Sequence, residues 1–171
     1  ETGNSLNIPI FNIPYHQKLL GEEADSYMGL ADIHQYPPSK FAIHESDLVL
    51  MVGARLDNQM NFGNPPFIPK TTTLVCINGS HEEIEFNRAA DHNLLCDPGV
   101  FLDTLCNLKK NNKWNLGNSW FQDNKNRKKD WVDKSLNEVL KMHSAFVNEF
   151  HVAPQVNPDS GLPHHEWLIE F

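Results

Sequence analysis

The residues of this chain best suited to chemistry lie in one short segment, Gly53-Ala54-Arg55. They follow an unbroken apolar run, residues 48–52, of the kind found in strands buried on both faces of a parallel sheet. The small residues Gly53 and Ala54 would let a ligand or a neighbouring backbone approach closely, and Arg55 offers planar donors suited to phosphate or carboxylate. Open α/β sheets bind ligands at the carboxyl ends of their strands. The segment therefore predicts nucleotide contact, although many buried strands also end in a glycine turn with a surface arginine.

Other kinds of catalytic site find no support in the sequence. The nine histidines show no His-Glu-x-x-His or comparable ligand cluster. The adjacent pair His164-His165 would point about 100° apart in a helix. The sequence also contains no Gly-x-Ser-x-Gly nucleophile motif and no Gly-x-x-x-x-Gly-Lys phosphate loop. We therefore expect neither a metal site nor a catalytic residue in this chain.

Bulk composition excludes several classes of partner. The net charge is −8, from 14 basic and 22 acidic residues, which disfavours binding to nucleic acid or to an anionic membrane. No apolar run approaches the roughly 20 residues that span a bilayer. The cysteines, Cys76, Cys96 and Cys106, have no metal-type spacing. Two of them lie in strand-like apolar runs, so we expect buried thiols in a reducing compartment and a cytoplasmic location.

The elements that must position the Gly53-Ala54-Arg55 segment alternate between strands and helices, which is typical of βαβ units and a parallel sheet. Strands are expected at residues 8–13, 48–52, 71–77 and 93–96. Helices are expected at residues 39–45, 81–87 and 97–108. Two stretches, residues 22–32 and 59–70, are interpreted as loops, because the first has no clear period and the second is rich in proline.

The composition changes near Asn107, and we divide the chain there. Residues 1–108 form the expected Rossmann-like domain, and residues 109–171 form a linker region. Within that region, a surface linker rich in Lys and Asn reaches residue 126. Residues 128–150 then show helical spacing of apolar side chains, which predicts an amphipathic helix that must dock on another surface.

The order and spacing of these segments carry a resemblance. Over roughly residues 7–106 the chain resembles the central domain of thiamine-diphosphate-dependent enzymes. It is most similar to the acetolactate synthase group and its relatives, the oxalyl-CoA decarboxylases and 2-hydroxyacyl-CoA lyases. In that family a strand ending in Gly-Ala-Arg precedes a strand with an acidic residue, then an Asn-Arg pair and a Gly-Asp before a helix. The present chain matches this order with Gly53-Ala54-Arg55, Asn87-Arg88 and Asp97.

The resemblance implies an α/β fold: a Rossmann-like parallel sheet, lacking its first strand, with a linker helix after it. It also implies that Gly53, Ala54 and Arg55 line an FAD site, an ADP-type site or, as in some members, no ligand at all. His34 matches a loop histidine near the flavin, with an ordinary loop histidine as the alternative. Asp97 either contacts an adenine or caps its own helix.

One position departs from the family pattern. Asn78 and Ser80 stand where the family tends to have aspartates, at the strand end that accepts the ribose hydroxyls of a nucleotide. An asparagine can still bond a hydroxyl, but without the strength of a charge-assisted hydrogen bond. This departure counts against tight binding of FAD.

The resemblance further implies a parent enzyme, a lyase or transferase that acts on 2-oxo acids or acyl-CoA with thiamine diphosphate and Mg²⁺. Its activating glutamate and its Gly-Asp-Gly…Asn motif are not found here, so the chain alone should not be catalytic. The expected partners are the pyrimidine- and diphosphate-binding domains of the same protein, in a homodimer or homotetramer. The alternatives are a stand-alone nucleotide-binding or sensor module and a purely structural spacer.

Overall fold

The computed structural model describes residues 6–13, 24–32, 37–84, 86–111 and 118–150. The chain divides into two compact units, residues 1–128 and 129–171, and each is described by itself. No helix in the described ranges is long and apolar enough to cross a membrane.

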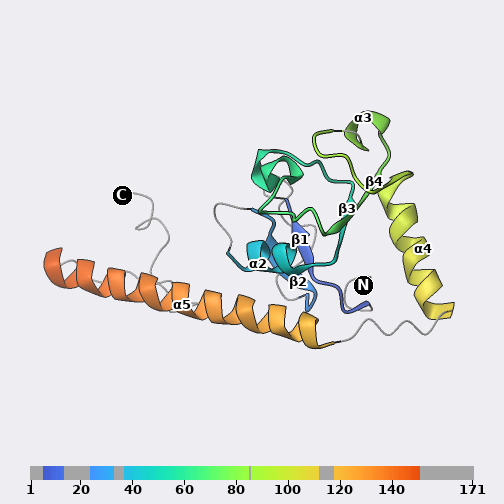
Figure 1. Cartoon of the computed structure of the whole chain (residues 1–171). Coiled ribbons are helices and arrows are strands. Elements are labelled where there is room, and N and C mark those ends of the chain that lie inside the picture. Colours follow the sequence, from blue (N-terminus) through green and yellow to red (C-terminus); the bar gives the residue numbers. More distant parts are fainter. Residues whose placement is uncertain (1–5, 14–23, 33–36, 85, 112–117, 151–171) are drawn as a thin grey trace. The chain divides into compact units, whose positions relative to one another are not determined.

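Among the described residues of the first unit, the larger sheet has three parallel strands in the order β3-β4-β5. Their bounds are Leu48–Val52 for β3, Thr73–Asn78 for β4 and His92–Leu95 for β5. Figure 1 labels two of these strands, β3 and β4. The central strand β4 is the most deeply buried, with Leu74 and Ile77 fully covered. The strands predicted at 48–52, 71–77 and 93–96 are therefore confirmed to within two residues.

A second, two-stranded parallel sheet joins β1 (Ile10–Asn12) to β2 (Tyr27–Leu30). The interpretation of residues 22–32 as a loop is wrong for the part that forms β2. Met28 and Gly29 are consecutive and both buried, so this four-residue strand lacks the apolar/polar alternation that marks a half-exposed strand. Helix α2 (Pro37–Glu45) follows and contacts β2.

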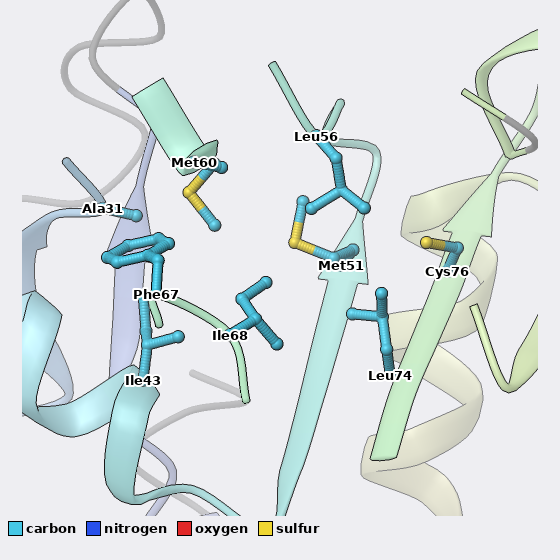
Figure 2. Packing of buried hydrophobic residues seen from close by; sticks show 9 residues of the cluster. All are labelled: Ala31, Ile43, Met51, Leu56, Met60, Phe67, Ile68, Leu74 and Cys76. Atoms are coloured by element: carbon cyan, nitrogen blue, oxygen red, sulfur yellow. The ribbon is translucent and has the colours of Figure 1, made fainter. Parts of the chain in front are cut away.

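The hydrophobic core joins the two sheets to the segment that follows β3. This segment contains the 3₁₀ helix η1 (Asn58–Gly63), which is interrupted at Asn61 and Phe62, both with positive φ. Phe67 and Ile68, from the stretch predicted as an irregular loop, are among the most buried side chains. Figure 2 shows Ile68 between Ile43 of α2 and Met51 of β3, with Phe67 beside Ile43 and Ala31. The stretch is irregular as predicted, yet it supplies the centre of the core.

Two helices flank the three-stranded sheet. The short α3 (His81–Ile84) follows β4, and α4 (Pro98–Asn111) follows β5. Together with the parallel strands, these helices confirm the α/β, Rossmann-like fold class.

Helix α5 (Ser119–Phe150) is longer than predicted, because its first turns fall in the stretch interpreted as a surface linker. Two of its residues, Phe121 and Asn124, are buried in the first unit, so tertiary packing makes this polar stretch helical. Lys125 and Arg127 add ion pairs to Asp25 and Glu45. In the second unit no side chain of residues 129–145 is buried, and docking of this part of α5 stays a prediction.

Candidate functional site at the carboxyl edge of the sheet

The parallel strands bring most of the predicted site residues to one edge. The Gly53 amide after β3 donates to the carbonyl of Ile77, 2.8 Å away, and the Cys96 amide donates to the carbonyl of Asn78 at 3.0 Å. The ends of β3, β4 and β5 are thus neighbours, as expected for a parallel sheet. His34 lies outside the described residues.

Gly53 is required by its immediate surroundings. Its φ of +63° lies in the left-handed region, which side chains with a Cβ rarely adopt. A Cβ added here would lie 3.1 Å from Cγ of Pro98, the first residue of α4. The close approach inferred from the small residue is therefore made by the protein's own backbone turn and by Pro98. Ala54 packs against the hydrophobic core.

Arg55 is held by two groups that follow β4. Its Nε donates to Oε2 of Glu83 at 2.6 Å, and its Nη2 donates to Oε1 of the same carboxylate. The guanidinium carbon lies 4.8 Å from the ring centre of Phe86, within cation–π range. The hydrogen bond to Glu83 raises the pKa of Arg55, and the same bond lowers the pKa of Glu83. Both side chains are therefore charged around neutral pH.

The remaining polar groups of the edge bond to their own chain. Asn78 accepts a hydrogen bond from the Ser80 amide through Oδ1 at 3.0 Å, closing a local turn. Asp97 accepts from the Val100 amide at 3.0 Å, so it caps the start of α4. Of the two roles considered for Asp97, the structure shows the cap.

Arg88 has a structural role that the sequence motif did not reveal. Its Nη1 donates to the carbonyl oxygens of Gly63, Ile68 and Pro69, at 3.1, 3.0 and 3.2 Å. Its Nη2 reaches the carbonyl of Thr72 at 3.4 Å. A planar, multidentate donor can serve several carbonyls of an irregular segment at once. The Pro69 carbonyl also accepts from the Thr72 amide at 3.2 Å.

Glu83 was also missed as a site residue, because its partner lies 28 positions away. Only the pairing of β3 with β4 brings the turn after Gly53 beside α3. The available signal was weak: an acidic residue in the first turn after the strand that neighbours Arg55. Charge complementarity across adjacent strand ends could have suggested the pair.

More than half of the chain matches one known protein family. A model described as "Thiamine pyrophosphate enzyme, central domain" matches residues 1–105. The chain belongs to the thiamine pyrophosphate enzymes. The match covers the five strands of the described residues and reaches into α4, so it includes the strand ends that form the carboxyl edge. A comparison with curated proteins finds no match.

Membership in the thiamine pyrophosphate enzymes implies thiamine diphosphate as the cofactor of the protein that carries this domain. The described residues do not offer a ligand set for the divalent cation that would accompany its diphosphate. Within the described ranges, no group of three or more His, Cys, Asp or Glu side chains could hold a metal ion.

Proposed function

We propose that this chain is the scaffolding central domain of a thiamine-diphosphate-dependent decarboxylase or carboligase of the acetolactate-synthase type. Its substrates would be 2-oxo acids or acyl-CoA compounds, and Mg²⁺ would accompany the cofactor. The family match supports the thiamine chemistry. The ion pair between Arg55 and Glu83 supports the scaffolding role, because it occupies the edge's strongest anion-binding group.

The neighbouring contacts support the same conclusion. Pro98 fills the space beside Gly53, Ser80 engages the side-chain oxygen of Asn78, and Asp97 is committed to capping α4. A nucleotide at this edge would have to break several of these contacts. Catalytic groups would come from the pyrimidine- and diphosphate-binding domains of the same protein, in a homodimer or homotetramer.

The test is an activity assay on the protein that carries this domain, reconstituted with thiamine diphosphate and Mg²⁺. Decarboxylation of pyruvate and of oxalyl-CoA would be followed with and without added FAD or ADP. We expect turnover of at least one substrate class without an adenine nucleotide, and we expect the Arg55→Gln variant to keep it. A strict requirement for FAD or ADP that is lost with Arg55 would contradict the scaffolding role.

A second candidate function is an adenine-nucleotide site, for FAD or ADP, at the same edge. The favouring observation is the exposure of the Arg55 side chain, 51% of which remains open to solvent despite its ion pair. In this alternative Gly53, Ala54, Arg55, Asn78 and Asp97 would surround the nucleotide, with Asn78 in place of the usual acidic ribose acceptor. Stoichiometric nucleotide in the purified protein would favour it.

A further inference from the structure

The Glu83 carboxylate binds the Arg55 guanidinium in the same way that a phosphate group would. Both of its oxygens accept hydrogen bonds, one from Nε and one from Nη2. This bidentate arrangement is the one by which arginine recognises phosphate as well as carboxylate. Phe86 holds the guanidinium plane from one face. The geometry therefore presents a preformed anion site whose occupant is part of the protein.

The Glu83 carboxylate is accessible to solvent, so an incoming anion could take its place on Arg55. The side chains of Arg55 and Glu83 keep 51% and 27% of their surface exposed. Exposed ion pairs contribute little to stability, so an incoming anion has only a modest barrier to displacing Glu83. The turn next to the pair is also open, since a Cβ added at Gly79 would meet no atom within 4 Å.

From these contacts we propose that Glu83 is an internal competitor for Arg55, and that it sets the affinity of the sheet edge for phosphorylated ligands. Glu83 is thus a specificity-determining residue, and an uncharged residue at this position opens the edge to a diphosphate. The inference rests on the part of the proposed function in which the protein's own contacts occupy the sheet edge. It does not depend on which reaction the thiamine enzyme catalyses.

The matched control is Glu82, the preceding residue of the same helix. Its side chain is exposed, and replacing it by glutamine removes the same charge from nearly the same place. A gain in affinity seen with Glu83→Gln but not with Glu82→Gln is therefore due to the release of Arg55. A gain seen with both would reflect only a less negative surface.

The test is calorimetric titration of ADP and of inorganic pyrophosphate into the folded protein at low salt. We expect Glu83→Gln to bind ADP about three- to tenfold more tightly than the wild type and Glu82→Gln, and the double variant Arg55→Gln/Glu83→Gln to lose the gain. Equal affinities in the two single variants, or a gain that persists in the double variant, would overturn the proposal. Should Glu83→Gln not fold, Glu83→Asp shortens the carboxylate at constant charge, and a gain over the wild type is required of it.

The titration and the test of the proposed function can fail independently of each other. Absence of thiamine diphosphate from the protein would refute the thiamine enzyme and leave the titration results untouched. Conversely, unchanged titrations would refute the role of Glu83 while thiamine-dependent turnover persists.

Discussion

Gly53 and Pro98 meet across the carboxyl edge of the sheet, so that a single added carbon at Gly53 would lie 3.1 Å from the proline ring. This contact links the end of β3 to the start of α4. It shows that the local packing of the protein itself favours a small residue at this place in the Gly-Ala-Arg segment. A glycine at a strand end is therefore weak evidence for a ligand until its neighbours are known.

Replacing Gly53 by alanine should destabilise the protein by about 1–2 kcal/mol, because alanine is strained at positive φ and its Cβ crowds Pro98. Urea unfolding followed by circular dichroism measures this change. Gly79→Ala is the control, since a Cβ there meets no atom within 4 Å, and its effect should stay within about 0.5 kcal/mol. Equal effects of the two substitutions would refute the structural role of Gly53.

Arg88 should be among the most sensitive polar residues of the chain. Arg88→Met removes the donor that serves the carbonyls of Gly63, Ile68 and Pro69, and we expect a loss of about 2–4 kcal/mol in the free energy of unfolding. Arg127→Met, which removes an exposed ion pair with Glu45, should cost less than about 1 kcal/mol. If Arg88→Met left the free energy of unfolding unchanged, the carbonyls of residues 63–72 would have to find other partners.

Glu83 should titrate below the ordinary pKa of a glutamate, because its hydrogen bond to Arg55 favours the charged form. A lowered pKa in the folded state means that the pair stabilises the protein above the unfolded-state pKa. That stabilisation is lost as the pH falls through the folded-state pKa. Carbon-detected NMR titration of the Glu83 carboxyl measures the midpoint. Arg55→Gln should move the midpoint upward, and an unchanged midpoint would contradict the pair.

Cys76 should be the least reactive of the three cysteines, which form no disulfide. It is 6% exposed, whereas Cys96 and Cys106 are half-buried. Burial raises the pKa of the Cys76 thiol, so the neutral form persists. Because the pKa is higher in the folded state, the stability of the protein is retained at a pH below the pKa of the unfolded-state thiol. It decreases as the pH rises through the pKa of the folded-state thiol. Labelling with a thiol reagent and mapping by mass spectrometry should find Cys76 modified last, and early modification of Cys76 would contradict its burial.

The sequence predicted those elements whose pattern is local. Strand β3 was recognised with its observed bounds, since its five residues form one unbroken apolar run. Strand β2 was missed because burial on both faces, with a glycine inside, leaves no alternation to read. The start of α5 was missed because the burial of Phe121 depends on tertiary packing.

The candidate site divides in the same way. The convergence of Gly53, Asn78 and Asp97 at one edge follows from parallel strands, and it was predictable. The partners of these residues were not, because Arg55 meets Glu83, and Gly53 meets Pro98, only through the register of the sheet. Sequence alone located the edge, and the structure shows the contacts that its residues make.

The central claim is that this domain serves a thiamine-dependent enzyme as a scaffold with a closed sheet edge. The most direct test is to denature the purified, folded protein that carries it and quantify the released cofactors by chromatography. We predict thiamine diphosphate near one molecule per chain, with FAD and ADP far below that ratio. An adenine nucleotide at one molecule per chain would contradict the closed edge, and a folded, magnesium-reconstituted protein that takes up no thiamine diphosphate would contradict the enzyme itself.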